Sequence, residues 1–258
     1  MTLSITEQRV ATARGALFVR QWWPEPSRGA PVLLLHDSLG CVELWREFPE
    51  QLARTSERRV IAYDRLGFGR SDAHPGLLRP GFVENEAQEG FSAVLEALGV
   101  DEFVVFGHSV GGGMAVSCAA RYPSRCQALI TESAQAFAEA RTLDGIRAAQ
   151  QQFADPSQFA RLSRYHGDKA EWVLRAWVDN WLSEAFADWN LDQVLSRVQC
   201  PLLSLHGDND EFGSEVHPSR LTQQTGGVSL LKLISGCGHV PHREQPGQVL
   251  AAVADFLR

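Results

Sequence analysis

The serine at position 109 lies in the sequence Gly107-His108-Ser109-Val110-Gly111. This pattern of glycines around a serine is a weak signal alone, because the chain has 22 glycines in 258 residues. Its surroundings strengthen it, since an apolar run at 103–106 predicts a buried strand and residues 114–121 predict a helix. A sharp strand-turn-helix would lift Ser109 above a sheet, in a strained backbone that flanking glycines permit. We therefore predict a nucleophile at Ser109, and the alternative is an incidental serine in a glycine-rich turn.

A serine hydroxyl becomes a good nucleophile only when a base takes its proton, so a histidine is required. We favour His239, which follows a predicted strand in the loop Ser235-Gly236-Cys237-Gly238-His239. His242 is its main rival and is otherwise interpreted as a solvated loop residue. His108 neighbours the serine, but adjacent side chains on so sharp a turn point apart.

An acid is needed to orient the histidine and to stabilise its cation. The sequence Gly207-Asp208-Asn209-Asp210-Glu211 follows a strand predicted at 202–206 and supplies three carboxylates. Asp208 is also suited to capping the turn, as aspartate often does, and we expect Glu211 to be solvated. The order serine, aspartate, histidine along the chain excludes the orders of chymotrypsin and subtilisin.

Negative charge on an attacked carbonyl oxygen needs donors that are already in place. The backbone N–H of Val110, at the start of the helix, is one predicted donor. We expect the second to be the N–H of Ser38, in the loop His36-Asp37-Ser38-Leu39-Gly40 after the strand predicted at 32–35. The alternative for this loop is a simple strand-to-helix turn.

Short apolar runs alternate with helical stretches, which predicts an α/β fold with a mostly parallel central sheet flanked by helices. Strands are expected at 32–35, 60–63, 103–106, 128–131, 202–206 and 230–234, with an N-terminal hairpin at 9–23. Apolar residues at helical spacing predict helices at 43–55, 83–98 and 246–257.

Residues 134–195 contain no convincing strand but much helix-forming sequence and four tryptophans. We interpret this segment as a helical insertion between core segments 1–133 and 196–258. Trp177 and Trp181 are four residues apart and share a helix face. We expect both rings, together with His36, to contact the substrate, and the alternative is that the rings only pack the insertion onto the core.

The composition limits the kinds of partner that the protein could bind. The net charge of −7 and the pI of about 5.6 do not fit a nucleic-acid or anionic-membrane surface. There is no signal-peptide pattern and no apolar run of roughly 18 residues, and the five cysteines are irregularly spaced, so we expect a cytoplasmic monomer or homodimer. No metal-ligand spacing is present, and the glycines at 107–113 lack the Lys-Ser/Thr ending of a phosphate loop, so we expect no metal and no cofactor.

Five motifs together resemble the α/β-hydrolase superfamily: His36-Asp37-Ser38-Leu39-Gly40, Asp64-Arg65-Leu66-Gly67-Phe68-Gly69-Arg70-Ser71-Asp72, Gly107-His108-Ser109-Val110-Gly111-Gly112, Gly207-Asp208-Asn209-Asp210 and Gly238-His239. The resemblance covers nearly the whole chain outside 134–195. It implies that Asp210 is the acid, that 134–195 is a helical cap and that 64–72 is mainly a structural loop. The chain departs from the family at Asp37, where glycine is more usual, and at Glu211-Phe212-Gly213, which lacks the proline that often follows the acid by a few residues. A serine at position 109 argues against epoxide hydrolases and haloalkane dehalogenases, which use aspartate.

The resulting hypothesis is a serine hydrolase that cleaves a carboxylic ester or lactone of a small to medium, partly apolar substrate through an acyl-enzyme. The same three residues also serve carbon–carbon bond hydrolases, perhydrolases and lyases of the menaquinone-pathway type, because a fold does not determine a reaction. A small-molecule receptor of the same fold is the alternative from another class.

Overall fold

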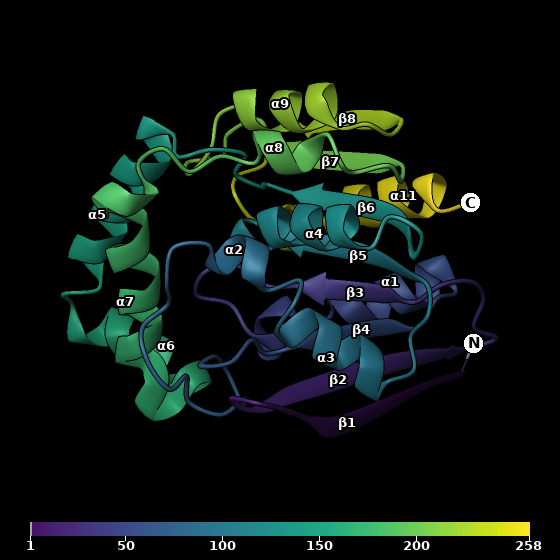
Figure 1. The fold of residues 1–258 in the computed structure, drawn as a ribbon, viewed down its shortest axis with the longest axis horizontal. Helices are drawn as coiled ribbons and strands as arrows, with labels where there is room; N and C mark the ends of the chain where they lie inside the picture. Colours follow the sequence, from purple (N-terminus) through teal and green to yellow (C-terminus); the bar gives the residue numbers. More distant parts are fainter. Residues whose placement is uncertain (1) are drawn as a thin grey trace.

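An eight-stranded sheet forms the centre of the computed structural model, which describes residues 2–258 (Figure 1). The strands are β1 (Thr2–Thr12), β2 (Gly15–Glu25), β3 (Val32–Leu35), β4 (Val60–Tyr63), β5 (Phe103–His108), β6 (Cys126–Glu132), β7 (Leu202–Gly207) and β8 (Ser229–Ile234). Their order is β1-β2-β4-β3-β5-β6-β7-β8; the β1–β2 and β2–β4 pairings are antiparallel and the remaining pairings are parallel. The predicted fold class is confirmed, and the hairpin is longer than the expected 9–23.

The central strands β3, β4, β5 and β7 are buried at every position. A parallel sheet is covered by helices on both faces, so its strands are continuous apolar runs rather than alternating ones. Helices α1 (Phe48–Ser56) and α11 (Pro246–Phe256) cover one face, where Leu52 and Val249 are fully buried. Helices α3 (Gly90–Ala97) and α4 (Val110–Arg121) cover the other, with Phe91 and Val116 in its core. The smaller helices α9 (Val216–Gln224) and α10 (Pro241–Glu244) lie near the C-terminal strands.

Two helices predicted as continuous are broken, so these predictions were wrong in extent. The expected helix 43–55 is a 3₁₀ turn, η1 (Val42–Trp45), followed by α1, with Arg46 between them at φ 56°. Pro49 explains the break, because proline fits the first turn of a helix but not its interior. The expected helix 83–98 is α2 (Phe82–Asn85) and α3, because Glu86 turns toward Tyr63 and fills the space beside Gly90.

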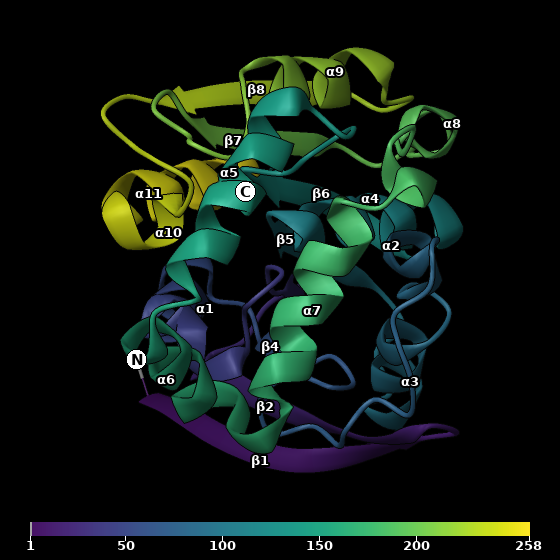
Figure 2. The same cartoon turned by 90° about the vertical axis from the view of Figure 1, so that its left-hand side faces the viewer.

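The chain between β6 and β7 forms helices and no named strand among the described residues. It contains α5 (Ala140–Gln152), α6 (Pro156–His166), η2 (Gly167–Lys169), α7 (Ala170–Trp181), η3 (Glu184–Phe186) and α8 (Asp192–Leu195). In Figure 1, α5, α6 and α7 stand beyond the arrowheads of the parallel strands, and Figure 2 shows them in front of that end of the sheet. These helices therefore face the edge where the loops carrying Ser109, Asp210 and His239 emerge.

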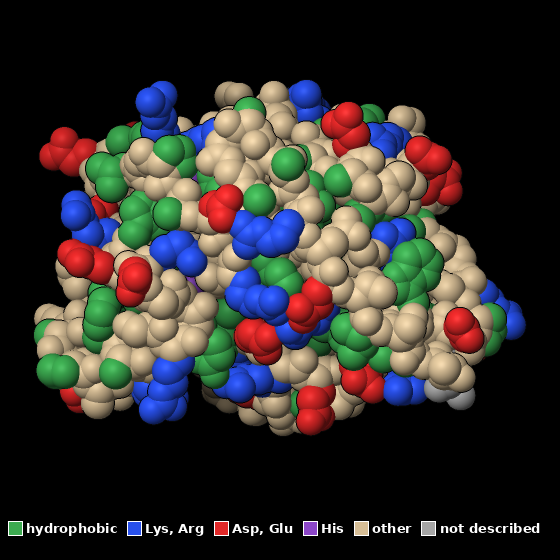
Figure 3. Space-filling view, turned by 90° about the horizontal axis from the view of Figure 1, so that it is seen from below, with side chains coloured by type: hydrophobic (Ala, Val, Ile, Leu, Met, Phe, Trp, Pro, Cys, Tyr) green, Lys and Arg blue, Asp and Glu red, His purple; other side chains and the backbone are tan. Residues whose placement is uncertain are grey.

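Within residues 2–258 no helix combines the length and apolar character needed to cross a membrane. On the face shown in Figure 3, basic and acidic side chains lie beside one another near the centre, between apolar patches. Neither sign of charge covers that face.

Candidate active site

Ser109 lies in a sharp turn between β5 and α4, with φ 56° and ψ −128°. A non-glycine residue in such a conformation costs roughly 1–3 kcal/mol and persists only where its surroundings enforce it. The turn depends on its glycines: a Cβ on Gly107 would overlap the Gly111 carbonyl, and one on Gly111 would overlap the Leu35 carbonyl. The strained turn therefore holds the Ser109 hydroxyl at the carboxyl edge of the sheet.

The structure brings Ser109, His239 and Asp210 into one hydrogen-bonded series. The Ser109 hydroxyl lies 3.0 Å from Nε2 of His239, in position to donate to it. Nδ1 of His239 lies 2.8 Å and 2.9 Å from the two carboxylate oxygens of Asp210. A histidine held this way carries its proton on Nδ1 and presents a lone pair to the serine, which is what a general base requires.

Asp210 is fixed by the loop that carries it. Its Oδ1 accepts hydrogen bonds from the backbone N–H groups of Phe212 (2.8 Å) and Gly213 (3.1 Å). Burial alone would raise the pKa of this carboxyl, but the hydrogen bond and charge of His239, helped by His206 and the Phe212 N–H, lower the pKa below its usual value. Asp210 is therefore an anion at neutral pH, although its side chain is fully buried.

The competing residues have other partners. Asp208 accepts from the backbone N–H of Gly236 at 2.8 Å and so ties two loops together. Glu211 is exposed, as expected from the sequence. The interpretation of His242 as a solvated loop residue was wrong, because it is buried in α10 and its Nδ1 donates to Glu132 at 2.6 Å.

The loop after β3 places Ser38 in the lining of the same cavity as Ser109. The Ser38 N–H makes no hydrogen bond among the described residues, and Val110 is the first residue of α4, whose N–H has no partner within the helix. His36 does not line this cavity. Its ring accepts from the Arg65 N–H at 3.1 Å and contacts the Asp37 carbonyl at 2.8 Å, so it shapes the loop from beneath.

His108 connects this loop to the loop of His239. Its Nε2 donates to the His239 carbonyl at 2.8 Å, and its Nδ1 lies 3.4 Å from the Asp37 carboxylate. Burial opposes the charged form of His108, but Asp37 and Glu132 outweigh it and raise the pKa of the ring. The pKa of Asp37 is lowered in return, because His108 outweighs the effect of burial. Asp37, the departure from the family pattern, is thus the partly exposed member of an ion pair whose histidine is buried.

Among the described residues, one group of side chains has ligand atoms close enough for a metal: His108, Glu132 and His242, within 4.8 Å of one another. Their lone pairs and protons are largely engaged already, since His242 donates to Glu132 and His108 donates to the His239 carbonyl. Only Oε1 of Glu132 is buried without a partner. The geometry is that of a hydrogen-bonded support beneath the catalytic loop.

A cavity of about 170 Å³ opens at Ser109. The walls are mostly apolar and include Leu39, Ile146, Trp177, Trp181 and Phe212. Sequence reasoning missed Gln135, whose side chain lies 3.4 Å from the Ser109 hydroxyl, and Thr142, because neither belongs to a recognisable motif. The cavity is smaller than the roughly 300–1,000 Å³ of pockets that hold drug-sized ligands.

The four tryptophans of the helical segment separate into two kinds. Trp177 and Trp181 both line the cavity at Ser109, and Trp181 also packs against Phe186 with ring centroids 4.9 Å apart. Trp172 packs on Phe68 at 5.5 Å, and Trp189 stacks on Phe186 at 5.0 Å. Trp172 and Trp189 are therefore packing residues, outside the cavity.

Known proteins resemble this chain in sequence and fold. A family model described as the alpha/beta hydrolase fold matches residues 30–246. Serine hydrolase BPHL of Mus musculus is 28% identical over 241 residues, which cover 88% of this chain and 79% of that protein. A thermophilic esterase from Thermogutta terrifontis aligns with TM-score 0.75 and 22% identity over 98% of each chain. Est816, an N-acyl homoserine lactone degrading enzyme, aligns with TM-score 0.74 and 22% identity over 96% of this chain and 100% of that one.

Proposed function

This chain is a hydrolase of the alpha/beta hydrolase fold family, and from that premise we propose that it cleaves a carboxylic ester or lactone of a small to medium, partly apolar substrate. The observation that carries the proposal is the series Ser109 to His239 to Asp210, at 3.0 Å and 2.8 Å, on a strained turn. A simpler polar contact would stabilise the fold equally well, so this series indicates a catalytic role.

In the proposed reaction, His239 takes the Ser109 proton through Nε2 as the serine oxygen attacks the substrate carbonyl. Asp210 holds the ring and stabilises its cation, without itself accepting the proton. His239 then protonates the departing alcohol, and an acyl-enzyme remains on Ser109. Water, deprotonated by His239, attacks the acyl carbon and releases the acid, which restores the serine hydroxyl.

The developing negative charge on the carbonyl oxygen is assigned to the backbone N–H groups of Ser38 and Val110. Neither group has a hydrogen-bond partner among residues 2–258, and both belong to residues beside Ser109. Donors aimed at an oxyanion in a site that excludes water are worth several kcal/mol in the transition state, roughly 2.7–4 kcal/mol for one donor.

We further assign helices α5–α7 the part of a cap that roofs the site. Ile146 of α5 and Trp177 and Trp181 of α7 complete the apolar wall of the cavity at Ser109. The volume of about 170 Å³ suits a short acyl group. The esterase from Thermogutta terrifontis and the lactone-degrading Est816 share the fold, which is consistent with this substrate class.

The test is labelling by a fluorophosphonate, read by intact mass, followed by a panel of aryl esters of increasing acyl length. Wild type should gain one adduct and turn over short esters many times. Ser109→Ala should lose the adduct and lower kcat/KM by roughly 10⁴-fold or more. Persistent labelling at another residue would overturn the assignment, and labelling without multiple turnover would favour a receptor.

A further inference from the structure

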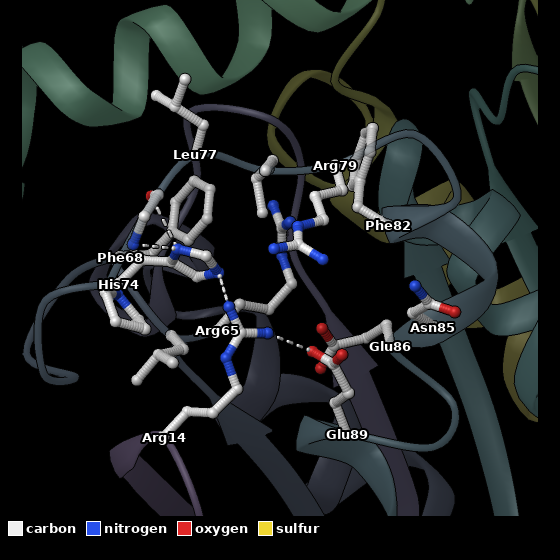
Figure 4. Close-up of a pocket in the computed structure, with 14 residues that line it drawn as sticks. Arg14, Arg65, Phe68, His74, Leu77, Arg79, Phe82, Asn85, Glu86 and Glu89 are labelled. Carbon is white, nitrogen blue, oxygen red and sulfur yellow. Dashed lines mark hydrogen bonds and ion pairs between the residues drawn. The ribbon is translucent and has the colours of Figure 1, made fainter.

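A second and larger cavity, of about 730 Å³, lies beside the catalytic pocket and has a charged lining. We call it the polar chamber and define it by Arg14, Arg65, His74, Arg79, Glu86 and Glu89, all of which line it (Figure 4). Segment 74–82, which precedes α2, forms much of its wall. None of these six residues takes part in the proposed reaction.

The arginines of the polar chamber are unequally paired. Arg14 forms an ion pair with Glu89 at 3.1 Å. Arg65 and Arg79 have no ion pair among the described residues, and in Figure 4 their side chains extend into the same part of the pocket. Two such positive charges lining one cavity favour a negatively charged ligand, and guanidinium groups match the flat geometry of a carboxylate.

Of the two arginines without an ion pair, Arg65 indicates an anion site more strongly than Arg79, because only 4% of its surface is exposed. One terminal nitrogen donates to the Asp37 carbonyl at 2.8 Å, but its buried Nε has no partner. Burial lowers the pKa of Arg65, and Glu86, Tyr63 and Asp37 oppose that shift only in part, while the unsatisfied N–H adds a further cost. A ligand carboxylate beside the guanidinium group would reduce the cost of burying this charge.

Glu86 does not fully neutralise the charge of Arg65. Tyr63 donates to it at 2.5 Å, and burial, which outweighs the attraction of Arg65, raises its pKa to about 7. Besides Tyr63 and Arg65, the charged or titratable groups that act on this pair are Glu89 and Cys118. A substantial fraction of Glu86 is therefore protonated near neutral pH, and the polar chamber keeps a net positive charge.

A small void of about 10 Å³, here called the gap, shares lining residues with both the polar chamber and the catalytic pocket. Arg65 and Leu78 border the gap on the chamber side, and Ser38 and Trp177 border it on the catalytic side. A volume of roughly 10–15 Å³ holds about one water molecule, so only a thin chain could pass, with Leu78 or Trp177 turned aside.

We propose that the polar chamber binds the carboxylate at the far end of an acyl chain, between Arg65 and Arg79, while the ester carbonyl of the same substrate lies at Ser109. The substrate is then an ester of a dicarboxylic acid with one carboxyl free and an unbranched chain that threads the gap. This inference rests on the proposed esterase function and narrows it to one class of acyl group.

The experiment compares two 4-nitrophenyl esters with equal carbon counts, the octanoate and the monoester of suberate. Arg79→Met should lower kcat/KM for the suberate monoester by on the order of ten-fold, since it removes one charge-assisted contact, and should leave the octanoate unchanged. Arg79→Lys should restore part of the loss. Arg121→Met is the matched control, because Arg121 is exposed at the end of α4, outside the polar chamber, and changes the net charge equally.

A binding measurement separates this inference from the proposed function. Free suberate should bind Ser109→Ala in calorimetry and lose affinity by a similar factor when Arg79→Met is added, whether or not esters are cleaved. Cleavage of the octanoate with no effect of Arg79→Met on the suberate monoester would overturn the inference and leave the esterase intact. Suberate that binds through Arg79 but inhibits octanoate cleavage non-competitively would mark a regulatory anion site, which also contradicts the substrate assignment.

Discussion

Replacing Asp210 by asparagine should reverse the polarity of the hydrogen bond that, in the proposed reaction, makes His239 a base. The amide oxygen would take the place of Oδ1, because the Phe212 and Gly213 N–H groups at 2.8 Å and 3.1 Å require an acceptor. The amide nitrogen would then face Nδ1 of His239 in the place of Oδ2, which lies 2.9 Å from that atom. Since an NH₂ group donates, it favours the ring tautomer in which Nδ1 accepts and the proton lies on Nε2, facing Ser109, in competition with the tautomer whose Nδ1–H donates to the amide oxygen at 2.8 Å.

The expected loss follows from these contacts. A charge-assisted hydrogen bond is worth roughly 1.5–3 kcal/mol, and a second loss of about 1–3 kcal/mol comes from the ring tautomer that cannot accept the serine proton. The sum is about 3–6 kcal/mol, or roughly 10²–10⁴-fold in kcat. The assay is turnover of a short aryl ester, with KM and the rate of fluorophosphonate labelling measured beside it.

Asp208→Asn is the matched control, because among the described residues this carboxylate accepts hydrogen bonds from the backbone N–H groups of Gly236 and Cys237 and from no side chain. An asparagine oxygen can accept both bonds, so kcat should change less than three-fold, at about 0.5 kcal/mol. A larger loss of kcat in Asp208→Asn than in Asp210→Asn would refute the reasoning. So would an Asp210→Asn variant with nearly wild-type kcat and an unchanged fold.

Three further predictions concern the pocket, the polar chamber and metals. We expect kcat/KM to rise from acetyl to butyryl esters by several-fold per CH₂, since each buried CH₂ is worth about 0.8 kcal/mol. Trp177→Ala should flatten this rise. Trp189→Ala, a control outside the cavity, should change only Tm. Glu86 binds a proton more tightly in the folded state, with a pKa of about 7, than in the unfolded chain, so this group makes stability fall as pH rises between its unfolded pKa and about 7. Glu86→Gln should therefore remove roughly 3 kcal/mol of the fall in unfolding free energy across that pH range, measured by urea titrations at several pH values, and an unchanged pH dependence would contradict the prediction. Ester turnover should survive dialysis against a chelator, and loss restored by a divalent ion would show that the His108, Glu132 and His242 group holds a metal.

The fold and the candidate site could be predicted from the sequence where neighbouring residues determine the local structure. Buried parallel strands are continuous apolar runs, so β3, β4 and β5 could be located closely. The turn at Ser109 follows from Gly107 and Gly111, because only glycine fits where backbone carbonyls approach so closely.

Sequence reasoning failed where a side chain is controlled by residues far away along the chain. The burial of His242 depends on Glu132, 110 positions earlier, and no local pattern signals that contact. The break before α3 depends on the contact of Glu86 with Tyr63. The polar chamber likewise brings together Arg14 and residues 65–89, so its charge balance exists only after the chain has folded.

The contact of His108 with both Asp37 and the His239 carbonyl divides the site into parts of unequal mobility. The loops after β3, β5 and β8 are tied together through one buried imidazole, so none of them can swing away from the others without breaking an ion pair or a hydrogen bond. Motions that admit substrate and release product must then fall to α5–α7 and to segment 74–82. Amide hydrogen exchange should accordingly be slow around residues 107–111 and faster in helices α5–α7. The base of the pocket would then stay rigid while the helices above it move.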